Sequence, residues 1–265
     1  MGAGAAPSVG TARTVDRFLG GTFALVQPAR GAHRCGSDAI LLAAMLPAAT
    51  GGHVVDLGSG PGAAGFAVAA RTGARVTLVD VDGQALAMAG ESLELADNAG
   101  LARRIGVCEA DVAGPGIAFE VAGLKAGTID HVLANPPFFQ LGKHRAALDA
   151  DRARARMLGE DGLLPWIRRA ASLLRSVGSL NLVLPTDLLP DAIAACAGRF
   201  GALDVMPLHP RAGMAADRVL VKAVKESRAA MRIVPGLVMH DADGAYSAAA
   251  ARVLREGQAL EWPGR

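Results

Sequence analysis

An asparagine followed by two prolines and a phenylalanine lies directly after an apolar run in the middle of the chain. The run covers residues 129–134 and predicts a buried strand, which Asn135-Pro136-Pro137-Phe138 follows. Proline fixes φ and restricts the residue before it, so the backbone leaves this strand extended. The Asn135 side chain and the Pro136 carbonyl then form two acceptors beside the ring of Phe138. This arrangement suits a planar group with an NH₂, such as adenine or a glutamine amide, although a proline-stiffened loop would also explain the isolated motif.

A glycine-rich segment follows an earlier predicted strand. Residues 53–57 predict a short buried strand, and Gly58-Ser59-Gly60 leads from it into an alanine-rich helix that ends near residue 71. Glycines at such a turn let a ligand approach the backbone and leave helix N–H groups facing it. Residues 60–65 also satisfy the dinucleotide fingerprint G-x-G-x-x-G, but Asp56 at the end of the strand would oppose a pyrophosphate. Its carboxylate suits a cation or an amine instead.

Two further acidic residues follow the next two predicted strands. The strand at residues 75–79 ends in Asp80-Val81, and the strand at residues 105–109 is followed by Asp111-Val112. Asp80 is placed to bind ribose hydroxyls through its two carboxylate oxygens. Asp111 is placed to accept a hydrogen bond from the amino group of an adenine ring. Each acid alone could be a solvated loop residue, but three acids after three successive strands, beside a glycine loop, predict a nucleoside site.

Strands and helices alternate along the chain, which predicts a parallel sheet with helices on both faces. Two late strands have no helix between them, so one strand must run antiparallel. Residues 231–240 could add a hairpin at the sheet edge, and Ser37-Asp38 predicts a helix N-cap. The other expected elements are helices at 83–99, 163–174 and 187–198 and strands at 179–184, 202–208 and 218–224.

Composition favours one cytoplasmic domain without a metal. The chain has 265 residues and a formal charge of +2, which is too small to demonstrate nucleic-acid binding by itself. Residues 1–16 predict a disordered leader without a signal peptide, and residues 17–260 predict a single domain. No apolar run is long enough to span a bilayer. The three cysteines are far apart, which is typical of a reducing compartment and gives no zinc cluster.

These residues resemble, in order, the motifs of S-adenosylmethionine-dependent amino-methyltransferases. The matching positions are Asp56-Leu57-Gly58-Ser59-Gly60, Asp80, Asp111 and Asn135-Pro136-Pro137-Phe138. The chain is still more similar to the tRNA (adenine-N6) methyltransferases that modify the anticodon loop of a valine tRNA. That similarity covers roughly residues 16–260 and includes Phe18-Leu19-Gly20-Gly21, Gln27-Pro28, residues 34–42, residues 209–213 and residues 218–221.

The resemblance implies a fold, a cofactor and a set of site residues. The fold is a seven-stranded, Rossmann-like class I methyltransferase sheet with one antiparallel strand. The cofactor is S-adenosyl-L-methionine, and the substrate is RNA, with no membrane and no metal. The implied catalytic residues are Asn135, Pro136, Pro137 and Phe138. The implied cofactor-binding residues are Asp56, Gly58, Ser59, Gly60, Asp80, Val81, Asp111, Val112 and Asn135.

Three alternatives remain open from the residues. The same chemistry could act on a glutamine amide of a translation factor, although only about 35 residues precede the first predicted helix and leave little room for a helical substrate domain. A ribosomal RNA is a second possible substrate. A non-catalytic RNA-binding protein could also keep the fold, but it would not require Asp56, Asp80 and Asn135 together. The basic residues between Lys143 and Arg156 either contact RNA phosphates or form a solvated loop.

Overall fold

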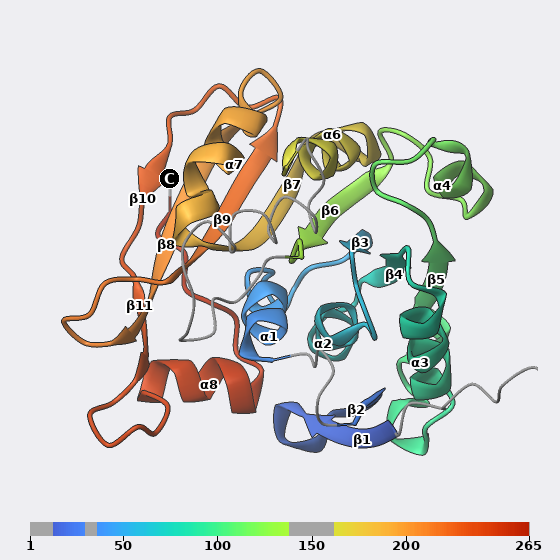
Figure 1. Ribbon diagram of the computed structural model, residues 1–265, viewed down its shortest axis with the longest axis horizontal. Helices are drawn as coiled ribbons and strands as arrows, with labels where there is room; N and C mark the ends of the chain where they lie inside the picture. The colour runs from blue at the N-terminus through green and yellow to red at the C-terminus, as the bar shows by residue number, and fades with distance from the viewer. Residues whose placement is uncertain (1–12, 30–35, 138–161, 265) are drawn as a thin grey trace, which may run out of the picture.

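The computed structural model describes residues 13–29, 36–137 and 162–264 (Figure 1). Its central feature is a large, mostly parallel sheet covered by helices on both faces. The strands run in the order β5, β4, β3, β6, β7, β9, β8, and β9 runs antiparallel to both β7 and β8. The predicted seven-stranded sheet with one antiparallel strand is therefore confirmed. The strand bounds are β3 (His53–Leu57), β4 (Arg75–Asp80), β5 (Ile105–Glu109), β6 (Ile129–Ala134), β7 (Leu174–Pro185), β8 (Phe200–Arg211) and β9 (Arg218–Lys225).

Two short strands extend the sheet beyond β8. β10 (Arg232–Ile233) and β11 (Leu237–His240) each pair with β8, and both pairings are parallel. The predicted edge hairpin is therefore wrong, because the two strands follow one another along β8 and do not pair with each other. Gly236 lies between them, and a Cβ there would come within 2.8 Å of the Pro207 carbonyl oxygen. The chain thus continues close along β8 through this residue, where a hairpin would have to turn back.

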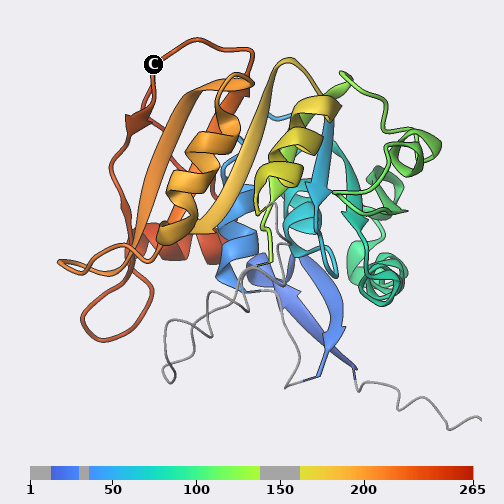
Figure 2. The same cartoon turned by 45° about the horizontal axis from the view of Figure 1, so that its top comes forward.

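Helices cover the two faces of the sheet, as Figures 1 and 2 show. Each face buries its own apolar cluster, and every residue of the central strand β3 is buried. Burial on both faces explains why the central strands are continuous apolar runs. One face carries α1 (Ser37–Ala44), α2 (Ala63–Arg71), α3 (Gly83–Leu93) and α8 (Ala248–Glu256). The other carries α4 (Ile117–Val121), α6 (Leu164–Leu173) and α7 (Leu189–Cys196).

Short 3₁₀ turns follow several of these elements. The helix predicted for residues 83–99 ends at Leu93 and is followed by the turn Ala96–Asn98. The helix predicted for residues 187–198 occupies Leu189–Cys196 and is preceded by the turn Thr186–Leu188. Two other turns are Leu19–Gly21 and Ala102–Arg104.

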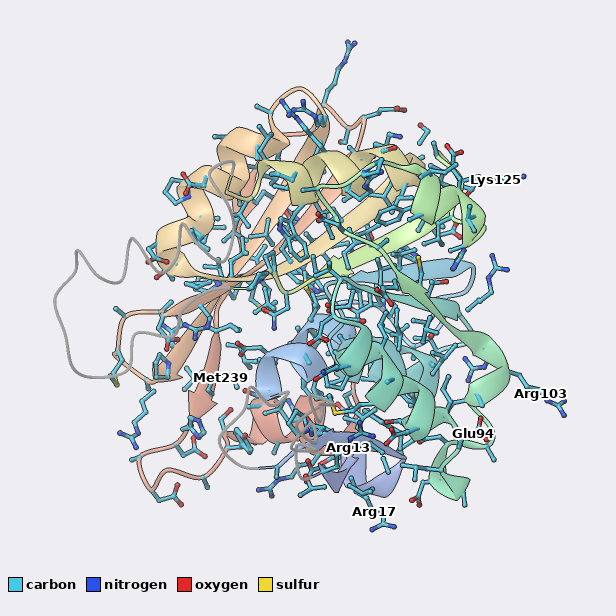
Figure 3. All side chains as sticks on the ribbon, turned by 45° about the vertical axis from the view of Figure 1, so that its right-hand side comes forward. Arg13, Arg17, Glu94, Arg103, Lys125 and Met239 are labelled. Carbon is cyan, nitrogen blue, oxygen red and sulfur yellow. The ribbon has the colours of Figure 1, made fainter. Side chains whose placement is uncertain are left out.

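A separate hairpin precedes the sheet. It consists of β1 (Arg13–Phe18) and β2 (Phe23–Pro28), and Arg13 and Arg17 lie on β1 (Figure 3). Residues 13–16, which the sequence placed in a leader, therefore lie in a strand. A hairpin of two strands is marginally stable alone, so its position depends on contacts with the rest of the chain.

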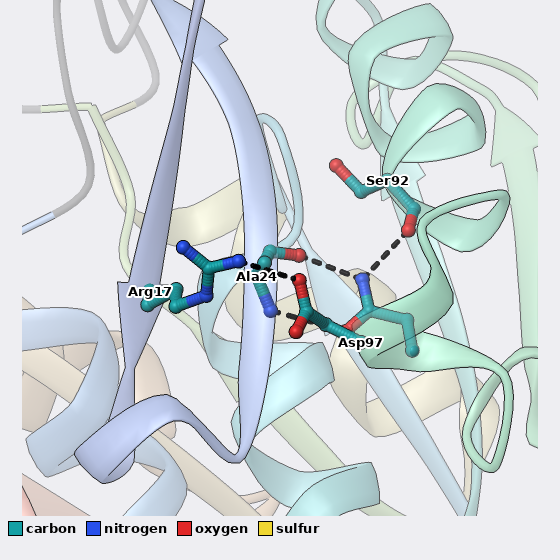
Figure 4. A network of polar contacts seen from close by, with 5 residues as sticks. Arg17, Ala24, Ser92 and Asp97 are labelled. Carbon is teal, nitrogen blue, oxygen red and sulfur yellow. Dashed lines mark hydrogen bonds and ion pairs between the residues drawn. The ribbon is translucent and has the colours of Figure 1, made fainter.

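Side chains from the segment after α3 hold the hairpin in place. The Asn98 Oδ1 accepts a hydrogen bond from the Ala24 N–H at 3.1 Å, and its Nδ2 donates to the Ala24 carbonyl at 2.7 Å. Asn98 thus pairs with the edge of β2 as another strand would. Its Nδ2 also donates to the carbonyl of Ser92, and Arg17 pairs with Asp97 at 3.2 Å (Figure 4).

Candidate active site

The carboxyl ends of four parallel strands bring the predicted site residues to one edge of the sheet. Leu57 at the end of β3 pairs with Val79 on one side and with Ala134 on the other. Asp80 at the end of β4 pairs with Glu109 at the end of β5. The segments that follow these strands therefore share one edge, which is where open α/β sheets bind ligands.

The glycine loop after β3 is fixed by hydrogen bonds to the neighbouring strand. The N–H groups of Gly58 and Ser59 donate to the Val79 carbonyl at 2.8 and 3.0 Å. The N–H of Gly60 donates to the Asp80 carboxylate at 2.7 Å. Gly60 has a φ of 53°, and a Cβ there would meet nothing within 4 Å. The loop is therefore rigid at Gly58 and Ser59, and open to a ligand at Gly60.

Two glycines in this region are required by close packing. A Cβ on Gly58 would come within 2.5 Å of the Trp166 ring on α6. A Cβ on Gly65, in the first turns of α2, would come within 2.2 Å of the Leu78 side chain on β4. Trp166 was not among the predicted site residues. Its contact with Gly58 joins elements that are far apart in sequence, and no local pattern signals it.

Asp56 lies in β3 just before the glycine loop and is hydrogen-bonded to the first turn of α2. The residue is 2% exposed, and its Oδ2 accepts a hydrogen bond from the Gly65 N–H at 2.8 Å. Burial raises the pKa of Asp56 to about 7, the Gly65 hydrogen bond partly opposes this, and the negative charge of Asp80 adds to it. Among the described residues, this carboxylate therefore accepts a hydrogen bond from the backbone of α2.

Asp80 joins the ends of β4 and the glycine loop. Its Oδ2 accepts from the Gly60 N–H, and its Oδ1 accepts from the Asp82 N–H at 2.9 Å. Each carboxylate oxygen has a further lone pair, so both can still accept a hydrogen bond from a ligand hydroxyl. The next residue, Val81, is 66% exposed and offers an apolar surface beside that carboxylate. The carboxylate can bind a diol, and the apolar surface can contact a planar ring.

Asp111 begins a tight turn after β5. Its Oδ1 accepts from the Ala113 N–H at 2.9 Å, and its carbonyl accepts from the Gly114 N–H at 3.0 Å. Val112 is 8% exposed. Residues of this turn and of α6 line a surface pocket of about 310 Å³. They are Val112, Ala113, Pro165, Arg168, Arg169 and Ser172.

Asn135 carries the most unusual polar atom of the site. Its Oδ1 is inaccessible to solvent and has no hydrogen-bond partner among the described residues. Pro136 is buried after it, and Pro137 is half-buried. Buried acceptors are nearly always hydrogen-bonded, so this oxygen is a strong candidate for contact with a ligand. Phe138 and the basic residues 143–156 lie outside the described residues.

The first turn of α1 approaches the same edge. The N-cap is Gly36, without a side-chain hydrogen bond, and Ser37 is the first helical residue. The predicted Ser37-Asp38 cap is therefore wrong. The Asp38 carboxylate instead lies 3.5 Å from Nε of Arg218, which pairs with Pro185 at the end of β7. This ion pair connects the start of α1 to the sheet.

The described part of the chain shows neither a metal cluster nor a spanning helix. No group of three or more His, Cys, Asp or Glu side chains within it could hold a metal ion. None of its helices is both long and apolar enough to cross a membrane. Cys108 and Cys196 are buried free thiols, and Cys35 lies outside the described residues.

The chain is similar to known methyltransferases. Residues 32–205 match the family model of the methyltransferase small domain. A tRNA1(Val) (adenine(37)-N6)-methyltransferase from Aeromonas salmonicida is 30% identical over 84% of this chain and 89% of its own length. A protein of the same name from Haemophilus influenzae is 26% identical over 85% of this chain and 91% of its own.

Solved structures show the same fold. A crystal structure from Agrobacterium tumefaciens, described as a predicted O-methyltransferase, is 36% identical over 84% of this chain and 98% of its own, with a TM-score of 0.69. The T. thermophilus 16S rRNA N2 G1207 methyltransferase, solved with AdoMet and guanosine, has a TM-score of 0.53 at 21% identity over 81% of this chain and 50% of its own. The chain thus belongs to the methyltransferase small domain family and is an S-adenosylmethionine-dependent methyltransferase.

Proposed function

We propose that this protein transfers a methyl group from S-adenosylmethionine to the exocyclic N6 of an adenine in tRNA. The observation that carries the proposal is the buried Oδ1 of Asn135, an acceptor without a partner among the described residues. An acceptor at this position suits a substrate that presents an N–H group, such as an exocyclic amine. The relatives named above are tRNA1(Val) (adenine(37)-N6)-methyltransferases, which supports adenine 37 of a valine tRNA as the target.

The chemistry requires a weak nucleophile to be activated. The lone pair of an adenine amine is delocalised into the ring, so the nitrogen attacks poorly. Hydrogen bonds from its N–H groups to the Asn135 Oδ1 and the Pro136 carbonyl favour a tetrahedral nitrogen whose lone pair points at the methyl carbon. These fixed dipoles also stabilise the positive charge that develops on the amine. The methylated cation is acidic and releases its proton to water, so no strong base is needed.

The remaining site residues would hold the cofactor, which supplies an electrophilic methyl group on a sulfonium. Asp80 would bind the ribose hydroxyls, and Asp111 the adenine amino group. Val81 and Val112 would contact the adenine ring, while the glycine loop of Gly58, Ser59 and Gly60 lets the cofactor lie against the backbone. Asp56 would act indirectly, by fixing Gly65 and the start of α2. Phe138 would stack on the substrate base.

Other acceptors remain as outcomes of the test. The Agrobacterium neighbour is described as an O-methyltransferase, but a hydroxyl acceptor needs a base to remove its proton. The Asn135 amide cannot act as that base, which favours an amine. A glutamine amide carries the same NH₂ group, and only the tRNA relatives distinguish it from adenine here. Ribosomal RNA is the remaining nucleic-acid alternative.

The test is transfer of labelled methyl from S-adenosylmethionine to an unmodified valine tRNA transcript, with nucleoside analysis of the product. The matched control is the same transcript with guanine in place of adenine 37. We expect N6-methyladenosine in the first transcript and no label in the second. Equal labelling of both would refute the position. Absence of label from all tRNA, with cofactor binding intact, would refute the substrate, and labelled protein or ribosomal RNA would then identify the acceptor.

The role of Asn135 has a separate test. Asn135→Ala removes one of the two proposed acceptors, and the loss of one such fixed dipole typically lowers kcat by about 100- to 1000-fold. We expect the affinity for S-adenosylmethionine, measured by calorimetry without RNA, to stay within about threefold. Asn135→Asp keeps an acceptor oxygen and should recover part of the lost rate. Near-normal turnover of Asn135→Ala would show that this side chain does not activate the amine.

A further inference from the structure

The turn after β5 needs support from elsewhere in the chain. It carries Asp111 and Val112, yet it follows β5, the last strand at its edge of the sheet, which pairs with β4 alone. The bonds within the turn connect Asp111 only to Ala113 and Gly114. Local bonds of this kind fix the shape of a turn. The Ala110 N–H donates to the Asp80 carbonyl at 2.9 Å and ties the start of the turn to β4, but the backbone at Val112–Gly114 needs a further contact to fix its position.

Arg169 on α6 supplies that support. Its Nε donates to the Val112 carbonyl at 3.2 Å, and its Nη2 donates to the Gly114 carbonyl at 2.5 Å. The two acceptors lie on either side of Ala113, so one planar guanidinium spans the turn. Arg is suited to this role because its donors form a rigid fork, whereas the ammonium of Lys is a single point.

The Arg169 guanidinium also packs against a buried aromatic ring. Its central carbon lies 4.3 Å from the centre of the Phe119 ring on α4, and Phe119 is 1% exposed. A Cβ on Gly116 would come within 3.4 Å of its Nη1. Stacking on a buried ring removes conformational freedom from the cation. Burial lowers the pKa of Arg169, and the nearby Asp111 carboxylate opposes that shift. A guanidinium keeps its charge in proteins.

The neighbouring Arg168 provides a matched comparison. It lies on the same helix, lines the same cavity and is exposed. Unlike Arg169, it makes no hydrogen bond to residues 111–114 in the described structure. The two side chains therefore share charge, helix and neighbourhood, and differ in the contact with the turn.

We propose that Arg169 is a positioning residue for the adenine of S-adenosylmethionine, acting by holding the Asp111–Gly114 turn in the position, relative to the sheet, that binds this ring. The proposal rests on the assignment of Asp111 and Val112 to the adenine, and it does not depend on the identity of the methyl acceptor. α6 thus contributes to cofactor affinity through the turn, with no contact of its own to the cofactor required.

The test compares Arg169→Met, Arg169→Lys and Arg168→Met in the full chain by calorimetric titration, without RNA. Loss of two charge-assisted hydrogen bonds to the turn should raise the Kd for S-adenosylmethionine about tenfold in Arg169→Met. Arg169→Lys, which can reach one carbonyl, should show a smaller increase of about threefold. Arg168→Met should stay within about twofold of the unchanged protein.

A second ligand separates positioning from general loosening of the site. 5′-Methylthioadenosine keeps the adenosine part of the cofactor and lacks its amino-acid end. If Arg169 positions the adenine turn, the Kd for both ligands should rise by the same factor. A larger loss for S-adenosylmethionine than for methylthioadenosine would overturn the proposal, because contacts far from the turn would then be disturbed. So would an unchanged Kd in Arg169→Met or Arg169→Lys. Failure of tRNA methylation would leave these binding results unaffected.

Discussion

The buried carboxyl of Asp56 makes the stability of the unliganded protein depend on pH. Its pKa is about 7 in the folded protein, against about 3.8 for the free side chain. Between these values the folded protein holds a proton that the unfolded chain has released. Stability is therefore highest below pH 4, falls as the pH rises from 4 to 7, and is constant above 7 as far as this group is concerned. Asp56→Asn removes the titration and keeps an acceptor for the Gly65 N–H.

The size of the effect follows from the interval between the two pKa values. Each unit of pKa difference corresponds to about 1.4 kcal/mol, and about two of the three units lie between pH 5 and pH 8. The unchanged protein should therefore lose about 3 kcal/mol more than Asp56→Asn across that interval. An unpaired amide N–H in the variant costs about 1–3 kcal/mol at every pH, and it cancels in the comparison.

Urea unfolding at pH 5 and pH 8, without cofactor, measures these free energies of unfolding. Asp243→Asn is the control, because Asp243 is exposed in a turn and accepts a similar backbone hydrogen bond from Ala245. We expect the loss of unfolding free energy from pH 5 to pH 8 to be smaller in Asp56→Asn than in the unchanged protein. The same loss should be unaltered in Asp243→Asn. The reasoning is refuted if Asp56→Asn and the unchanged protein lose the same stability between the two pH values.

Two further pairs of substitutions test the fold. Val177 has a φ of 57° and is 66% exposed, so Val177→Gly should raise the free energy of unfolding by about 1 kcal/mol, whereas Val107→Gly in β5 should lower it by a similar amount. Thermal unfolding of both variants checks this, and a loss of stability in both would show that Val177 is not strained. Arg71→Met should lower the free energy of unfolding by about 2–4 kcal/mol, because it removes a half-buried cation from three carbonyls. Arg103→Met at an exposed position should change little (Figure 3). The three carbonyls that accept from Arg71 belong to Ala43, Leu46 and Gly257. Equal losses of stability in the Arg71 and Arg103 variants, measured by urea unfolding, would contradict the argument.

The central strands could be predicted from the sequence because burial on both faces makes them plain apolar runs. The central strands at 53–57 and 129–134 have the predicted bounds. The edge strand at 105–109 also has them, although three of its five residues are exposed. Once these strands are parallel neighbours, the residues that follow them must meet at one edge, so the grouping of Asp80, Asp111 and Asn135 follows from order alone. Three residues scattered over the chain thus lie along one edge of the sheet without any local signal that joins them.

Contacts between distant elements could not be predicted in this way. The β1–β2 hairpin begins at residue 13, inside the leader expected for residues 1–16, and it is held by Asn98, whose side chain acts as a strand partner. Arg169 and Trp166 contact site loops from α6, and nothing in their own helix indicates those partners. The orientation of Asp56, however, could have been predicted from the sequence. It alternates with Val55 and Leu57, which face the α6 side of the sheet, so it must face α2.

The site combines rigid loops with polar groups that are costly without a ligand. The glycine loop is fixed by Val79 and Asp80, and the Asp111 turn is fixed by Arg169. A fixed site loses little conformational entropy on binding, which favours affinity and orientation. The buried Asn135 oxygen is different, because it gains a partner only when a donor arrives. A substrate amine that satisfies this oxygen therefore recovers a desolvation cost already present in the folded protein, and a base without an N–H at that point does not. Selection of an amino-bearing base then follows from the same acceptor that is proposed to activate it.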